Sequence, residues 1–489
     1  MRTATERTNL ALFVGLLLIA VLVGLLGAYL ADGQVIDGDL TYWRYDDTAE
    51  VVDTIGLGQF SEGQIVAVGR ENTSVFDGEA WSVQGAGDRN LANTAQGPDG
   101  KIWFRTCPGT LVVYWDQDGW RGSGQFGGGY AQDGWMLDIV AWRGNACFVF
   151  GRDLNIGADV YTYCAPSCDN MRAIRSLSGP PAGQYGEHSF WGSTVSGDYL
   201  SIISTGPPRI IHIPGWDVWD LPDCPWGVFT DAHQGSNGYF WIEHHEGYPY
   251  PPIGLLQVDA ETRQSKYVDW LNGIAIDSLA MDWRGLWVLA GGSDREDNRA
   301  FGVAFWSFRN AEPDMIRSLP AEIGIHGYAI VGWHAKVTRR MTVASPGELW
   351  FATDKAVVRW TPEPELIPMP YEARVEAQAK EGGAVDVEIE FDNERIIRND
   401  ATLHLKIEFL IEGDTEPIPL FESYSVYHEF QPQETFTYSF DHTPEAPPSA
   451  DKVRYTVYTT YIDVNAPPAA LDDEKIVISN VATAEVQLQ

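Results

Sequence analysis

The sequence has little positive charge, few cysteines and no long hydrophobic run after its first 30 residues. Its 33 Lys and Arg residues stand against 68 Asp and Glu residues, which gives a formal net charge of −35. A field of that sign repels phosphate backbones, and no basic stripe interrupts it, so nucleic acid is not an expected partner. The charge favours solubility of an exposed domain, and binding of a cation or a basic partner is the alternative.

Sequence signatures of nucleophilic and nucleotide chemistry are also missing. The chain contains no Gly-x-Ser-x-Gly, no His-Glu-x-x-His, no phosphate-binding loop and no dinucleotide fingerprint. The glycines of residues 126–130 are not followed by a helical pattern, and the acidic residues 294–298 lack the spacing of a calcium loop. The sequence therefore names no cofactor and no catalytic residue, and it favours a protein that is not an enzyme.

Long Ala, Leu, Glu and Lys runs typical of helices are absent outside the N-terminus, whereas aromatic residues and glycine are plentiful. The chain holds 49 Gly, 28 Pro, 19 Trp, 21 Tyr and 20 Phe residues, a composition typical of turns and aromatic-rich strands. At 489 residues it is too long for one ordinary core. We therefore expect an all-β protein with at least two domains.

One hydrophobic segment is long enough to cross a membrane. Residues 10–30 carry no charge, and a helix of this length reaches about 30 Å at about 1.5 Å per residue. Arg2 and Arg7 precede it, so residues 1–9 are expected to be a short cytoplasmic tail. The alternative is a cleaved secretory signal. Either way, the rest of the chain is expected outside the cytoplasm, attached to the cell membrane by a single signal-anchor helix.

The expected location outside the cytoplasm indicates that the cysteines can pair, because disulfides form readily outside the cytosol. The five cysteines are Cys107, Cys147, Cys164, Cys168 and Cys224. Cys164 and Cys168 flank a short turn with a proline, and we expect them to form a disulfide. The pairing of the other three stays open.

A Gly turn followed by an apolar strand recurs seven times after the hydrophobic segment. The turn glycines are Gly63, Gly100, Gly144, Gly197, Gly238, Gly285 and Gly347. Each copy predicts four antiparallel strands, and a sheet of four strands cannot cover its own faces, so the copies are expected to pack around an axis. Residues 40–361 therefore predict a seven-bladed β-propeller, in which residues 40–52 supply a strand to the last blade.

Two resemblances refine this prediction. Residues 99–114 and 347–360, and partly 285–290, resemble the repeats of two-component-regulator propellers, Asp-Gly-x-Ile-Trp-Phe-x-Thr followed by Leu-x-x-Tyr. Such propellers are periplasmic ligand sensors, which implies sensing here on behalf of a separate chain. "GYFWIEHHEG" and "IGLLQVD" are similar to streptogramin-lyase repeats, in which histidine and glutamate from several blades carry the reaction.

A second domain is expected after a proline-rich linker at residues 362–371. Residues 372–489 alternate apolar and polar side chains, as in Val385, Val387, Ile389 and Phe391 against the intervening acidic residues. About seven such strands predict an immunoglobulin-like β-sandwich. This segment also resembles bacterial adhesion-type sandwich modules, which implies a spacer or docking role.

The candidate site lies on the loop-rich face of the propeller, where variable connections gather. We expect a protein, glycan or small-molecule ligand to bind there. The candidate residues are Glu243, His244, His245, Tyr248, Tyr250, Asp294 and Arg295. In the alternative hypothesis, Glu243 and either His244 or His245 form a metal-assisted lyase or hydrolase site. Convergence of these side chains at the axial mouth would favour the enzyme.

Overall fold

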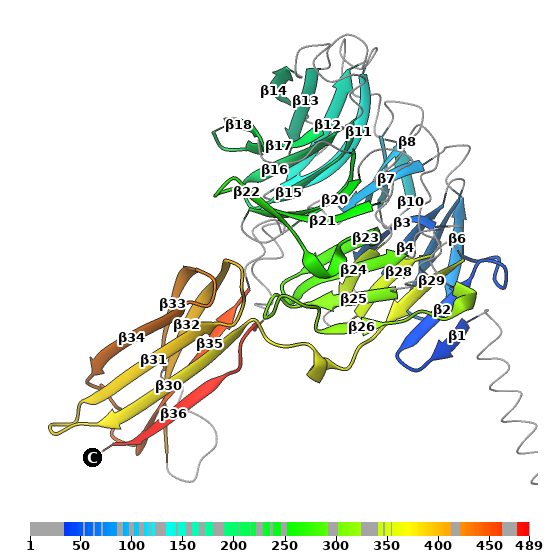
Figure 1. The fold of residues 1–489 in the computed structure, drawn as a ribbon. Coiled ribbons are helices and arrows are strands. Elements are labelled where there is room, and N and C mark those ends of the chain that lie inside the picture. Colours follow the sequence, from blue (N-terminus) through cyan, green and yellow to red (C-terminus); the bar gives the residue numbers. More distant parts are fainter. Residues whose placement is uncertain are drawn as a thin grey trace, which may run out of the picture.

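The chain is all β-strand apart from three short 3-10 helices, among the residues that the computed structural model describes (Figure 1). The 3-10 helices are η2 (Asp269–Leu271), η3 (Ala321–Ile323) and η4 (Pro364–Leu366). The described residues are 34–51, 54–61, 64–69, 72–85, 91–96, 102–106, 112–116, 119–122, 134–142, 145–152, 159–165, 172–178, 190–204, 206–215, 217–221, 228–234, 238–245, 252–291, 302–323, 341–345, 348–353, 355–411, 421–461 and 477–488. None of their helices is long and apolar enough to cross a membrane, and the expected spanning segment 10–30 lies outside them.

Six antiparallel sheets of four strands follow one another along the chain. The first contains β3 (Thr54–Ser61), β4 (Gln64–Gly69), β5 (Asn72–Phe76) and β6 (Trp81–Gly85), and the second β7 (Leu91–Gln96), β8 (Ile102–Thr106), β9 (Val112–Asp116) and β10 (Gly119–Gly122). The third contains β11 (Gly134–Trp142), β12 (Asn145–Arg152), β13 (Asp159–Ala165) and β14 (Arg172–Ser178), and the fourth β15 (Phe190–Ser196), β16 (Tyr199–Ser204), β17 (Gly206–His212) and β18 (Asp217–Asp220). The fifth contains β19 (Val228–Gln234), β20 (Tyr239–His245), β21 (Pro252–Asp259) and β22 (Gln264–Tyr267), and the sixth β23 (Ala275–Asp282), β24 (Gly285–Gly291), β25 (Gly302–Trp306) and β26 (Met315–Arg317).

A seventh sheet joins the two ends of this region. Its strands are β27 (Met341–Ser345), β28 (Glu348–Ala352), β29 (Ala356–Trp360), β2 (Leu40–Arg44) and β1 (Gln34–Asp37). The register pairs Leu40 with Trp360, so the N-terminal strand completes the sheet made by the last repeat. The prediction that residues 40–52 supply the closing strand is confirmed for β2.

The first strands of the seven sheets contact one another in a closed series. Each of β3, β7, β11, β15, β19, β23 and β27 contacts the next, and β27 contacts β3. This closed ring of radial sheets is a β-propeller. Every sheet in such a ring buries both faces against its neighbours, which explains why apolar residues occupy successive positions of strands such as β24 and β25.

Side chains on successive residues of β20 enter two different cores. Tyr239 and Trp241 belong to the apolar cluster shared with the sixth sheet. Phe240 and Ile242 belong to the cluster shared with the fourth sheet. Because side chains alternate between the two faces of a strand, the two residues of β20 that follow Ile242 also point in turn toward the sixth sheet and toward the fourth.

The turn between β23 and β24 requires glycine at its last position. A Cβ atom added to Gly285 would lie 2.2 Å from the carbonyl oxygen of Trp306. The turn glycine predicted from the repeat is thus needed here for close packing of the turn against the end of β25.

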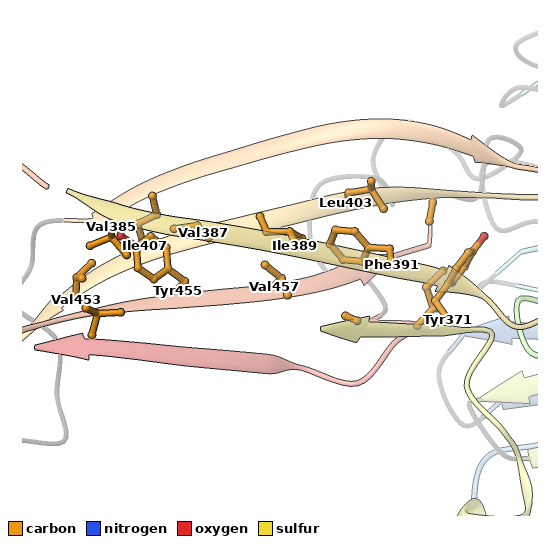
Figure 2. Packing of buried hydrophobic residues seen from close by; sticks show 14 of the residues in the cluster. Tyr371, Val385, Val387, Ile389, Phe391, Leu403, Ile407, Val453, Tyr455 and Val457 are labelled. Carbon is orange, nitrogen blue, oxygen red and sulfur yellow. The ribbon is translucent and has the colours of Figure 1, made fainter. Parts of the chain in front are cut away.

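The C-terminal domain, residues 371–488, contains two sheets packed over one core. The first sheet contains β30 (Tyr371–Ala379), β31 (Val385–Asn393) and β34 (Thr435–His442), and the second contains β33 (Phe421–Phe430), β32 (Asn399–Leu410), β35 (Lys452–Thr460) and β36 (Ala482–Gln487). Figure 2 shows side chains from both sheets meeting between them, among them Ile389 and Phe391 from β31 and Tyr455 and Val457 from β35. The alternation predicted for residues 385–391 is confirmed, because its apolar members are buried.

Candidate functional site

Glu243 lies near the end of β20, just before the connection that follows His245. Its side chain is buried, and its Oε1 accepts a hydrogen bond of 2.9 Å from the backbone N–H of Ile276. Ile276 lies at the start of β23, the inner strand of the sixth sheet. The carboxylate therefore links two neighbouring sheets at the loop end of the ring.

His244 points to the opposite face of the same strand. It is fully buried, its Nδ1 lies 2.6 Å from the hydroxyl oxygen of Tyr267, and the two rings are stacked. Tyr267 packs against the apolar cluster shared with the fourth sheet. Glu243 and His244 thus occupy different interfaces between sheets, so these two residues do not form an acid–base pair.

The described residues include one of the five other predicted site residues. His245 is the last residue of β20, and its backbone pairs with Val228 and Pro252. Tyr248, Tyr250, Asp294 and Arg295 lie outside the described residues.

The pairing of β12 with β13 bears on the predicted disulfide between Cys164 and Cys168. Cys164 lies on β13, directly opposite Cys147 on β12. Cys168, its predicted partner, lies outside the described residues. Opposed Cα atoms in an antiparallel pair are about 4.5–5.5 Å apart, which falls in the range that a disulfide spans. Cys164 therefore has a second candidate partner that spacing along the chain does not reveal.

The opposite end of the ring carries the contact with the C-terminal domain. The connection between β31 and β32, residues 394–398, lies against three turns of the fifth and sixth sheets, and we name it the docking segment. Ile276 and Asp282 stand near opposite ends of β23, whose eight residues span about 25 Å at about 3.3 Å each. The docking segment meets the end that carries Asp282 and is therefore far from Glu243.

Arg395 is the central residue of this contact. Its side chain is fully buried, and its Nη2 donates to the backbone carbonyl oxygen of Trp283 at 2.6 Å and to that of Arg284. Its guanidinium lies 5.8 Å from the ring centre of Phe308. Burial lowers the pKa of Arg395 to about 10, so the side chain remains charged at neutral pH.

The rest of the docking segment adds polar and apolar contacts. Arg398, also buried, forms ion pairs with Asp259 at 2.6 Å and with Glu261, both at the turn between β21 and β22. The N–H of Ile396 donates to the carbonyl oxygen of Phe308 at 2.8 Å. Ile397 is buried in the apolar cluster between the fifth and sixth sheets. The segment is thus held by charge, backbone hydrogen bonds and apolar burial together.

One group of side chains in the described part of the chain has the spacing of metal ligands. Glu372, Asp392 and Glu394 offer carboxylate oxygens within 4.8 Å of one another. Arginines already pair with all three, however. Arg374 binds Glu372 at 2.9 Å and Asp392 at 2.7 Å, and Arg309 binds Glu394 at 3.2 Å. The positive charge near these carboxylates disfavours a cation there.

Sequence reasoning missed Arg395 and Arg398. The signal available was a pair of arginines flanking two isoleucines, in the run Asn393–Asp400, at the point where one strand ends and the next begins. Such a mixture of apolar and basic residues is unusual for a solvated turn, but it does not name the turns that it contacts.

No protein-family model matches the chain, and no curated protein matches it. Similar solved structures include a streptogramin B lyase at 12% identity, with a TM-score of 0.44, covering 67% of this chain and 98% of that one. The extracellular domain of a putative one-component system from B. thetaiotaomicron is 9% identical, with a TM-score of 0.43, covering 93% of this chain and 62% of that one. YCF48 from Cyanidioschyzon merolae is 14% identical, with a TM-score of 0.38, covering 63% and 95%. All three are β-propeller proteins, and identities this low carry no activity across.

Proposed function

We propose that this chain is a membrane-anchored, extracytoplasmic scaffold that binds a ligand without transforming it. In this proposal a seven-bladed propeller presents its loop face to a protein, glycan or small molecule. An immunoglobulin-like sandwich is fixed to the opposite face, and residues 10–30 hold the chain in the cell membrane.

The observation that carries the proposal is the burial of Arg395 against the turns of the sixth sheet. A buried guanidinium that binds two backbone carbonyls fixes both position and orientation, since its donors form a rigid fork. The C-terminal domain thereby occupies the turn end of the ring. The end of the ring at which β20 and β24 finish faces away from it and remains for a ligand.

The contacts of Glu243 and His244 support binding over catalysis. Both side chains are buried in interfaces between sheets, and each has a partner within the fold. A general base must reach a substrate proton directly or through one water molecule, and neither residue extends toward a shared position. Sensing for a partner chain is compatible with this arrangement, because a rigid ring and domain would pass on a change made at the loops.

The test is a binding screen on the full chain purified in detergent, against arrays of glycans and peptides. A triple variant, Tyr248→Ala, Tyr250→Ala and Arg295→Ala, is expected to lose at least about tenfold in affinity while unfolding at the same temperature as the parent. The matched control replaces three exposed residues at the turn end, Glu79→Ala, Arg263→Ala and Glu312→Ala. Binding that depends on the control residues, or conversion of the bound molecule into a product, would overturn the proposal.

A further inference from the structure

The two sheets of the C-terminal domain are closed along one side and open along the other. On the closed side, the side-chain amide of Asn480 donates to the carbonyl oxygen of Ala373 at 2.8 Å and accepts from its N–H at 2.7 Å. On the other side, β33 and β34 are each the last strand of their sheet. No backbone pairing joins these two strands within the described residues, although a single turn connects them. We name this side the open seam.

Side chains that face inward at the open seam are exposed. Val426 stands opposite Leu403 and Tyr424 opposite Leu405, so both share the face of β32 that forms the core. Leu403 is 6% exposed, but Val426 is 59% and Tyr424 53% exposed.

The second sheet repeats this pattern across the seam. Tyr438 on β34 stands opposite Ile389, which is 4% exposed, yet Tyr438 is 56% exposed. Apolar side chains oriented toward a core but left uncovered on both sheets mark a surface shaped for another strand.

The edge at β33 lacks the usual protection against pairing. Exposed edge strands are commonly blunted by Lys, Pro or a bulge. Neither β33 nor β34 contains Lys, Arg, Pro or Gly, and the pairing of β33 with β32 is regular throughout. A ten-residue strand therefore offers an uninterrupted row of backbone donors and acceptors.

The charges at the open seam are acidic. Glu422 and Glu429 lie on β33, and the two strands carry no Lys or Arg, although Asp441 on β34 pairs with Lys380 and Glu422 accepts a hydrogen bond from the hydroxyl of Tyr424. A second copy of this chain would bring the same acids together, and its net charge of −35 opposes self-association. Charge complementarity instead favours a basic partner.

We propose that the open seam binds an extended segment of a partner protein in which apolar and basic side chains alternate. Its backbone extends the sheet at β33, its apolar side chains cover Tyr424, Val426 and Tyr438, and its basic side chains project to the opposite face of the sheet, where Glu429 lies. This mode of recognition takes affinity from backbone hydrogen bonds and specificity from alternate side chains. The seam is a second binding surface, separate from the loop face of the ring.

The experiment uses the full chain and a labelled nine-residue peptide of alternating Lys and Val, measured by fluorescence anisotropy. A Glu–Val peptide tests charge, and a Lys–Val peptide with prolines at the central positions tests backbone pairing. We expect the Lys–Val peptide to bind at least about tenfold more tightly than either. Hydrogen exchange of β33 amides should slow when it is bound.

Two matched variants separate the seam from general charge attraction. Val426→Lys places a charge in the seam, whereas Ile316→Lys adds the same charge at an equally exposed apolar residue on β26. Binding should weaken roughly tenfold in the first and stay unchanged in the second. Equal effects of the two variants, or equal binding of the three peptides, would overturn the proposal. A concentration-dependent dimer that Val426→Lys abolishes would assign the seam to a second copy instead, and would overturn it as well.

Discussion

The Nη2 atom of Arg395 donates a hydrogen bond of 2.6 Å to the carbonyl oxygen of Trp283, across the boundary between the ring and the C-terminal domain. The two residues are 112 positions apart in the chain. Trp283 also packs against the core of the C-terminal domain. The turn between β23 and β24 therefore packs in both the ring and the C-terminal domain. The domain is attached to the ring by this contact as well as by its linker.

Arg395→Ala is expected to loosen this attachment. It leaves two buried carbonyl groups without their donor and creates a cavity, at a cost of about 2–4 kcal/mol in the local opening free energy. Hydrogen exchange should quicken at residues 394–398 and 283–285 and stay unchanged in β4. Arg454→Ala is the control, since Arg454 forms only an exposed ion pair with Glu485 worth less than about 1 kcal/mol. Equal exchange in both variants would argue against a structural role for Arg395.

Asp39→Asn is expected to weaken the closure of the ring in a pH-dependent way. Asp39 accepts hydrogen bonds from Trp360 at 2.6 Å and from Arg317 at 2.9 Å. Burial acts to raise the pKa of Asp39, but these hydrogen bonds and the charge of Arg317 outweigh it, and the pKa is lowered. A carboxyl whose folded pKa is lowered stabilises the fold above its unfolded pKa, and this stability is lost as the pH falls through the folded value.

Urea unfolding at several pH values measures this effect. At pH 7 the variant should be less stable by about 1 kcal/mol, since the site is partly exposed. The difference should shrink below about pH 4, the ordinary pKa of an aspartate, and vanish in stronger acid. Gln264→Ala, at an exposed residue of β22 that does not titrate, is the control and should leave the stability unchanged at every pH. A constant difference at all pH values would contradict the assignment.

Substitutions of Glu243 separate a structural role from a catalytic one. Glu243→Gln keeps an oxygen for the N–H of Ile276, whereas Glu243→Ala removes it and should cost about 1–3 kcal/mol. We expect the urea midpoint to fall clearly for Ala and only slightly for Gln. The catalytic hypothesis predicts the reverse pattern: unchanged midpoints, with both variants losing turnover of a bound ligand.

The register of the third sheet makes a prediction about Cys164. Mild oxidation of the folded, full-length chain should cross-link Cys164 to Cys147, because the two Cα atoms oppose each other on β13 and β12. Peptide mapping without reductant identifies the link. Cys164→Ser should abolish it, and Cys224→Ser should not. A link between Cys164 and Cys168 instead would contradict this prediction and would support the disulfide expected from the spacing of these two cysteines in the sequence.

Much of the ring could be predicted from sequence because its repeat is local. Each turn glycine is followed within one residue by an apolar strand, as at Gly238 and Gly285. The strand that closes the ring was also recognisable, since Tyr42 and Trp43 precede the first repeat. Turns and strands of this kind depend on the spacing of the repeat and on local composition, and both can be recognised in a single sequence.

The roles of individual polar residues could not be predicted in the same way. Glu243 binds a backbone N–H of the next sheet, and any residue at that position of β23 except proline would offer the same donor. His404 stands between Leu403 and Leu405 in an alternating strand, yet it is also buried. It stacks on Tyr458 and lies 2.7 Å from the hydroxyl of Thr460, because β32 has a neighbour on each side. Such contacts join residues far apart in the chain.

The central claim is that Arg395 and Arg398 hold the C-terminal domain in one orientation on the turn end of the ring. It is tested most directly by electron–electron distance measurement between genetically encoded spin labels at Ser82 on β6 and Ser439 on β34, both exposed. The account predicts one narrow distance distribution that broadens when Arg395 and Arg398 are both replaced by alanine. A broad distribution in the unsubstituted chain, unchanged by the two replacements, would contradict it.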